Sequence, residues 1–245
     1  MLNRSVLAWF AGFGLFAGLL VPKLGAQDTG NAPLVFYASS SGQQTLDQGE
    51  GGGNPFASAL IELMGNKNLT LRDFPKKLAT LTAQKSRDRQ LPQVPDRLQP
   101  VDWQFTPKPE GERRLALVLV YSDYSASGGA KSLPGAKRDA QRLTEALERA
   151  GFETQKVIDP DRSSLSASLS NFKLRSKDAD IGLLYTTGHG VEVAGTVYLL
   201  PGDYPIARQR DALADFAIPI AKLSATPHAR VANFVFYGGC RDNPF

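Results

Sequence analysis

Two side chains of this sequence could act together as a nucleophile and a base: the thiol of Cys240 and the imidazole of His189. His189 follows the apolar run 181–185 within Thr-Gly-His-Gly. Cys240, the single cysteine, comes 51 positions later and follows the apolar run 231–236. A histidine about 50 residues before a cysteine, each after a buried strand, is a known spacing for a nucleophilic cysteine. The pair predicts attack of a thiolate on a carbonyl carbon, with the imidazole carrying the proton.

Both residues also have interpretations without chemistry. Cys240 could be a small buried apolar side chain, and His189 a polar side chain at the end of a strand. A single cysteine cannot form a disulfide within the chain, so the thiol is either buried or used. His228 follows a proline on an expected loop and is interpreted as a surface residue. The combined pattern around His189 and Cys240 favours catalysis.

From residue 113 onward, strand patterns alternate with helix patterns. Continuous apolar runs predict strands that are covered on both faces, and apolar residues spaced by three and four predict helices. Such alternation predicts an α/β fold with a mostly parallel central sheet and helices on both faces, that is, three layers. The expected strands are 115–121, 152–158, 181–185 and 231–236. Helices are expected at 136–150 and 218–223, and a further helix is expected to start with Ser163 or Ser164 as its cap. A hairpin is expected at 193–200, with its turn at Gly195.

The segment before residue 106 has a pattern of its own. It predicts a strand at 34–38, a glycine-rich loop at 42–53 and a helix that Asn54 and Pro55 start and Gly65 ends. A second helix is expected at 71–85 and a last strand at 101–105. One or two strands cannot form a stable sheet alone, so we expect this segment to share a core with the rest of the chain. Residues 106–113 are the expected linker between the two portions.

Residues 1–26 are interpreted as a targeting segment. A positive charge at Arg4 precedes an apolar stretch at 6–21, and Ala26 ends an acceptable cleavage site. The stretch of about 16 residues is short for a membrane span, which needs roughly 20. A cleaved signal predicts an exported protein, periplasmic or secreted, without stable membrane association. An uncleaved N-terminal membrane anchor is the alternative.

The charge pattern argues against a nucleic-acid partner. The formal net charge of +4 falls to +2 if residues 1–26, which carry Arg4 and Lys23, are removed. No basic stripe with interleaved aromatic residues occurs, so no nucleic acid is expected as a partner. The sequence indicates neither a cofactor nor a metal site, and the oligomeric state cannot be inferred from it.

Five short motifs give the region after the linker a family likeness. Along the chain these are the start of a strand, the start of a helix, a Gly-His-Gly turn, a Tyr-Leu-Leu-Pro-x-Asp element and a cysteine motif. These motifs are Arg114-Leu115-Ala116-Leu117-Val118, Lys137-Arg138-Asp139-Ala140, Gly188-His189-Gly190, Tyr198-Leu199-Leu200-Pro201-Gly202-Asp203 and Cys240-Arg241-Asp242-Asn243-Pro244-Phe245. With them the chain resembles the caspase-like peptidases of the C14 type, especially the metacaspase and paracaspase branch.

The resemblance assigns roles to individual residues. Cys240 would be the nucleophile and His189 the base of a cysteine endopeptidase that acts on proteins or peptides. The backbone N–H groups of Gly190 and Cys240 would bind the oxyanion. Asp139 and Asp47 would line the first specificity pocket and select Arg or Lys. Glycine at 188 and at 190 is expected to let the substrate backbone approach closely.

The order of the portions differs from that of most relatives. Residues 27–105 resemble the small (p10-like) portion, which usually follows the cysteine, whereas 114–245 resemble the large (p20-like) catalytic portion. The chain is therefore similar to a circularly permuted caspase-like domain that spans 27–245. Gly238 replaces an aspartate that the family usually carries, which keeps a catalytically inactive binding module as the alternative function. Calcium activates part of this family, but no ligand cluster in the sequence supports a calcium site.

Overall fold

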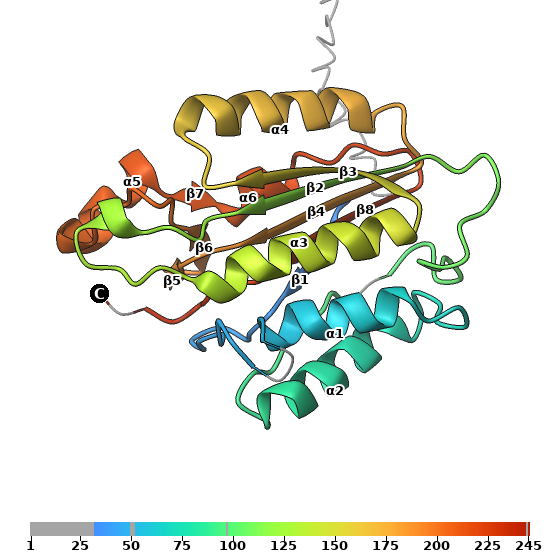
Figure 1. Ribbon diagram of the computed structural model, residues 1–245, viewed down its shortest axis with the longest axis horizontal. Helices are drawn as coiled ribbons and strands as arrows, with labels where there is room; N and C mark the ends of the chain where they lie inside the picture. Colours follow the sequence, from blue (N-terminus) through green and yellow to red (C-terminus); the bar gives the residue numbers. More distant parts are fainter. Residues whose placement is uncertain (1–31, 50–51, 97, 244) are drawn as a thin grey trace, which may run out of the picture.

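The computed structural model describes residues 32–49, 52–96, 98–243 and 245 (Figure 1). The predicted targeting segment at 1–26 lies outside these residues. Within the described part of the chain, no helix is both long and apolar enough to cross a membrane.

A five-stranded parallel sheet forms the centre of the molecule, in agreement with the predicted α/β class. Its central strands are mostly apolar and are buried along their whole length, as expected for strands covered on both faces. In spatial order the strands are β1 (Leu34–Tyr37), β8 (Ala232–Tyr237), β4 (Ile181–Thr187), β2 (Arg114–Val120) and β3 (Phe152–Ile158).

Helices cover both faces of this sheet and complete three layers (Figure 1). Residues of both the early segment and the later one contribute to the core on the first face, where Phe56 and Phe236 meet. The helices on that face are α1 (Pro55–Met64), α2 (Phe74–Ser86) and α3 (Pro134–Arg149), and those on the other are α4 (Arg162–Ser176) and α6 (Ile220–Ser224).

A small antiparallel sheet extends from the end of β4. It contains the predicted hairpin, which turns at Gly195 with a φ of 77°, a conformation that favours glycine. Its strands are β5 (Gly190–Val193), β6 (Thr196–Leu199) and β7 (Ile218–Pro219), and the short helical segments nearby are η1 (Ser125–Ser127), η2 (Ile206–Ala212) and α5 (Leu213–Phe216).

Local side-chain caps explain where two of the helices, α1 and α4, begin. The Asn54 side chain accepts a hydrogen bond from the N–H of Phe56 at 2.8 Å, so α1 starts where the sequence predicts. The helix α4 differs, because its cap is Asp161 rather than Ser163 or Ser164. The Asp161 carboxylate accepts the N–H of Ser164 at 2.7 Å and thereby satisfies a free donor of the first turn.

The expected strand at 101–105 does not form. Only one isolated bridge, between Thr70 and Gln104, occurs there. Trp103 instead packs its ring 5.0 Å from that of Phe234, in the core. The N–H of Leu71 donates to the Trp103 carbonyl at 2.7 Å, which holds Leu71 outside the helix that was expected to begin there. Burial of aromatic rings and this backbone pairing replace the strand and delay the start of α2.

Candidate functional site

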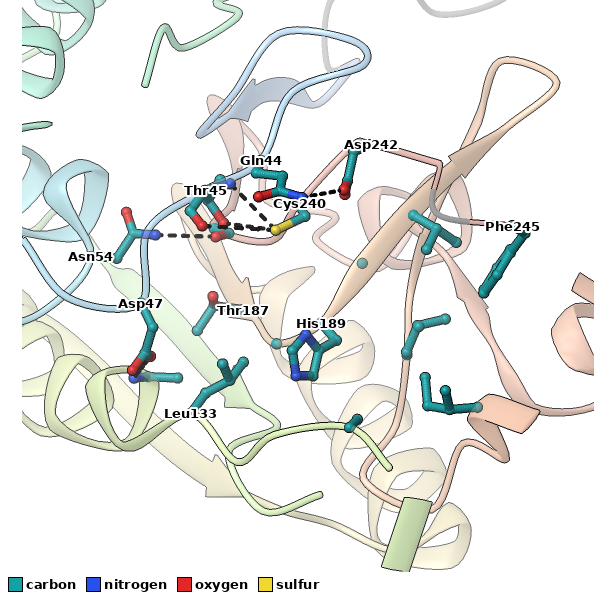
Figure 2. A pocket seen from close by; sticks show the side chains of 18 residues that line it. Gln44, Thr45, Asp47, Asn54, Leu133, Thr187, His189, Cys240, Asp242 and Phe245 are labelled. Carbon is teal, nitrogen blue, oxygen red and sulfur yellow. Dashed lines mark hydrogen bonds between the residues drawn. The ribbon is translucent and has the colours of Figure 1, made fainter. Parts of the chain in front are cut away.

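His189 and Cys240 line the same cavity, of about 390 Å³ (Figure 2). His189 lies two residues after β4, and Cys240 lies three residues after β8. Because β4 and β8 are neighbouring parallel strands, their carboxyl ends open at one edge of the sheet, where α/β proteins bind ligands. Thr45 and Asp47, from the segment before the linker, form part of the wall.

Tyr124 positions the His189 backbone and ring. Its hydroxyl accepts the His189 N–H at 2.7 Å and donates to the Leu200 carbonyl at 2.8 Å. The tyrosine ring lies edge-on to the imidazole, with ring centres 4.4 Å apart. Tyr124 is almost fully buried, so both contacts are shielded from water and fix the turn that carries His189.

A backbone carbonyl sets the proton position on His189. Nε2 lies 2.7 Å from the carbonyl oxygen of Lys131. A carbonyl oxygen only accepts hydrogen bonds, so Nε2 carries a hydrogen. In the neutral imidazole, Nδ1 then has the free lone pair. The histidine is thereby held in the tautomer that can take a proton through Nδ1.

The Cys240 sulfur is contacted by Thr45. The Thr45 N–H donates to it at 3.3 Å, and Thr45 Oγ1 lies 3.4 Å away (Figure 2). Burial raises the pKa of the Cys240 thiol, and the hydrogen bonds from Thr45 act in the opposite direction. Among the described residues, no hydrogen bond joins the thiol to His189. Each of the two groups therefore contacts a neighbouring loop while facing the shared cavity.

The backbone N–H of Gly190 points toward the segment that contains Cys240. In an antiparallel pair of strands, hydrogen-bonded and non-hydrogen-bonded residue pairs alternate. The Leu200 N–H donates to the His189 carbonyl, so the next pair, Gly190 with Leu199, is a non-hydrogen-bonded one. The Gly190 N–H therefore points away from β6. On that same side, two residues farther along β5, the N–H of Glu192 donates to the Asp242 carbonyl.

Gly190 lines the cavity, and the packing around it also requires glycine. A Cβ there would lie 1.7 Å from the Tyr237 hydroxyl and 2.7 Å from the Cys240 carbonyl oxygen. Protein atoms, not a substrate backbone, occupy this space. Tyr237 also donates to the Cys240 carbonyl at 3.2 Å, so the missing side chain allows β8 to fix the position of Cys240.

Asp47 lines the cavity and also caps α3. Its two carboxylate oxygens accept the N–H groups of Gly135 and Ala136, each at 3.0 Å. The α3 N-cap residue, Leu133, has no capping side chain, so Asp47 takes its place from a distant part of the chain. The negative charge also complements the helix dipole.

Asp139 is completely buried behind Asn54. Its Oδ2 accepts the Asn54 N–H at 2.6 Å, and its Oδ1 lies 3.3 Å from Nη1 of Arg142. Desolvation raises the pKa of Asp139 to about 7, against the opposing effects of the Asn54 hydrogen bond and of Arg142. Only Asp47 of the two expected pocket acids reaches the cavity wall.

The space beside Gly238 is filled. A Cβ at this position would lie 2.8 Å from Thr187 Oγ1 and 3.0 Å from the Tyr185 hydroxyl. An aspartate at 238 could not enter without displacing Thr187, which directly precedes the Gly-His-Gly turn. Side chains of β4 therefore fill the space beside Gly238 under the cavity.

Arg241 connects the cysteine turn to the early segment. Its side chain is buried, and Nε lies 2.9 Å from a Glu192 carboxylate oxygen. Nη1 donates to the Ser39 carbonyl at 3.2 Å, and the guanidinium lies 4.4 Å from the centre of the Tyr37 ring. These contacts hold the residue that follows the thiol against β1 and its loop.

Comparisons with known proteins identify the family. The model of the caspase domain, Peptidase C14, matches residues 113–241. The chain belongs to the caspase-domain family. Membership implies cysteine peptidase chemistry, and the matched range contains both His189 and Cys240. The predicted caspase-like fold class is thereby confirmed.

The remaining comparisons add little. Among solved structures, the crystal structure of Chaetomium thermophilum Raptor is similar at 16% identity over 58% of this chain, with a TM-score of 0.30. The match spans only 12% of that structure's chain. The comparison with curated proteins gives no match. Within the described residues, no three His, Cys, Asp or Glu side chains converge in a way that could hold a metal ion.

Sequence reasoning missed two side chains of the site, Thr45 and Tyr124. Thr45 acts on a residue 195 positions away, and its flanking Gly-Gln-Gln pattern carries no sequence signal for that contact. Tyr124 lies shortly after β2, at the same sheet edge as His189, and its place after a buried strand was a usable clue.

Proposed function

We propose that this protein is a cysteine endopeptidase that uses Cys240 and His189 and cleaves after Arg or Lys. The observation that supports it best is the shared cavity, in which the thiol and an imidazole with a free Nδ1 face one another across space for a peptide. His189 takes the thiol proton, the thiolate attacks the carbonyl carbon, and the imidazolium returns the proton to the leaving amine. Water then hydrolyses the acyl-enzyme.

Two backbone donors are proposed for the oxyanion. The N–H of Gly190 faces the Cys240 segment and is not used by the β5–β6 ladder, and the N–H of Cys240 itself would be the second donor. Loss of one such donor costs about 2.7–4 kcal/mol of barrier in a related kind of site. Asp47 on the cavity wall supports a preference for a basic side chain, with Asp139 behind it.

We also propose that the chain is a permuted, exported member of its family. The family match begins at residue 113, and β1, α1 and α2 precede it. These elements nevertheless join the same sheet and core as the matched region. The apolar stretch at 6–21 supports export to the periplasm or the medium. We expect no cofactor.

A peptide panel that varies only the residue before the scissile bond tests the peptidase. Wild type should cleave Arg and Lys peptides, while Cys240→Ala and His189→Ala should lose at least about 10³-fold in rate. His228→Ala is the matched control, because His228 is the only other histidine of the sequence and lies exposed on a separate loop. Absence of hydrolysis in folded wild type, under reducing conditions and with or without calcium, contradicts the proposal.

An inactive binding module is the second candidate. The absence of a direct thiol–imidazole hydrogen bond, among the described residues, and the filled space at Gly238 favour it. In that case basic peptides should bind to wild type and to Cys240→Ala equally, without turnover. Titration of a fluorescent peptide against both proteins separates this outcome from catalysis.

A further inference from the structure

We propose that Thr45 is a catalytic residue: its backbone N–H and its hydroxyl donate hydrogen bonds to the Cys240 sulfur and stabilise the thiolate. The proposal rests on Cys240 as the nucleophile of the proposed peptidase. It adds a residue that lies outside the caspase-domain match at 113–241. Figure 2 shows Thr45 directly beside the sulfur, on the cavity wall formed by the early segment.

The first support is geometric. Thr45 N–H lies 3.3 Å from the sulfur and Oγ1 lies 3.4 Å from it, so two donors of one residue converge on the reacting atom. A protonated thiol can donate to the threonine hydroxyl, but a thiolate only accepts. When the proton leaves for His189 Nδ1, rotation of the hydroxyl turns it into a second donor. Hydrogen bonds to an ionised group are stronger than those to a neutral one.

The second support is the way in which Thr45 is held. Just before it, the chain pairs with the cysteine turn: Gly42 N–H donates to the Arg241 carbonyl at 3.1 Å, and Arg241 N–H donates to the Gln43 carbonyl at 2.9 Å. The Gln44 side chain donates to Asp242 at 2.7 Å. This short ladder fixes the register that places Thr45 opposite Cys240. A residue held by backbone pairing can act as a preorganised donor.

The third support is that, in the described part of the chain, no side chain other than that of Thr45 forms a hydrogen bond with the sulfur. The His189 Nε2 hydrogen points to the Lys131 carbonyl, and no imidazole–thiol hydrogen bond is found in the described part of the chain. The sulfur lies in a largely buried position, where an unstabilised negative charge is costly. The two hydrogen bonds from Thr45, and a weaker effect of the Cys240 backbone, lower the pKa of the thiol and offset part of this cost.

The test uses the fact that the chain has one cysteine. The rate of alkylation by iodoacetamide, measured from pH 5 to 10, reports the titration of Cys240 alone. We expect Thr45→Val, which keeps the shape and the N–H but loses the hydroxyl, to raise the apparent pKa by about one unit. At a pH below both pKa values, alkylation should then slow by about tenfold. Thr45→Ser, the matched control, keeps both donors and should titrate as wild type.

Repeating the titration in a His189→Ala background separates Thr45 from the imidazole, and the shift should persist there. An unchanged or lowered pKa in Thr45→Val overturns the proposal. Faster alkylation at every pH with an unchanged pKa also overturns it, since Thr45 would then only cover the sulfur. Should Thr45→Val fail to fold, Thr45→Ala removes the same hydroxyl. The experiment needs no peptidase activity, so its outcome is independent of whether peptides are cleaved.

Discussion

The backbone N–H of Asn54 donates a hydrogen bond to Oδ2 of Asp139 across 2.6 Å, and Asp139 is completely buried. The contact joins the start of α1 to the first half of α3, over 85 positions of the chain. It places a carboxyl group in a poorly solvated position beneath the cavity. That position gives Asp139 an unusual titration, with a measurable consequence for stability.

Acidic pH should stabilise the folded protein through Asp139. Its pKa is raised from 3.8 to about 7 on folding, so the folded state binds this proton more tightly than the unfolded state. The contribution is therefore fully present below about pH 4 and is lost as the pH rises to 7. A shift of this size corresponds to at most about 4 kcal/mol. Urea unfolding of wild type and Asp139→Asn between pH 4 and 8 measures the difference.

Comparison with Asp139→Asn removes the contribution of the other acidic residues, because these residues titrate in both proteins. The difference in free energy of unfolding between the two should change with pH only across the window from 4 to 7. A difference that stays constant over that window would show that Asp139 is ionised in the folded protein at all these pH values.

Removal of the Asp47 carboxylate should weaken the start of α3. Asp47→Ala leaves the N–H groups of Gly135 and Ala136 without their acceptor, and the loss of such a cap costs about 0.5–2 kcal/mol. Asp47→Asn retains one acceptor oxygen and should lose less. Chemical denaturation checks the order of stability, wild type above Asn above Ala. Equal stability of Asp47→Ala and wild type would refute the capping role.

A methyl group at position 238 should damage both stability and activity. The Cβ of Gly238→Ala would meet Thr187 Oγ1 at 2.8 Å and Thr187 Cβ at 2.9 Å, and overpacking of this kind costs about 1–3 kcal/mol. Displacement of Thr187 would also move the turn that carries His189. Thermal unfolding and peptide hydrolysis measure the two effects.

Gly65→Ala is the matched control for this prediction. Its Cβ would meet only the Glu62 carbonyl, at 3.6 Å, an ordinary contact distance. Its φ of −79° also suits alanine. We expect its stability to stay within about 0.5 kcal/mol of wild type. A Gly238→Ala protein that is as stable and active as Gly65→Ala would contradict the close packing around Gly238.

The predicted elements agree with the structure where local chemistry decides them. The strand that begins at Ile181 and the α1 cap at Asn54 occur as expected, because an apolar run or a cap acts over a few residues. The strand predicted at 101–105 does not form, because the Trp103 ring packs against Phe234 in the core. No local sequence pattern predicts that long-range contact. The cap of α4 is Asp161 rather than Ser163 or Ser164, because an aspartate is as able as a serine to accept the free N–H groups of the first turn.

The sequence by itself determined the alternation of strands and helices, and with it that His189 and Cys240 follow strand ends. Apolar periodicity and glycine turns encode such features within a short stretch of chain. Only the tertiary structure decided that Thr45 meets the sulfur, that Asp47 caps α3 and that a Lys131 carbonyl fixes the imidazole tautomer. These contacts join segments 58 to 195 positions apart, and all three use backbone groups, which every residue carries alike.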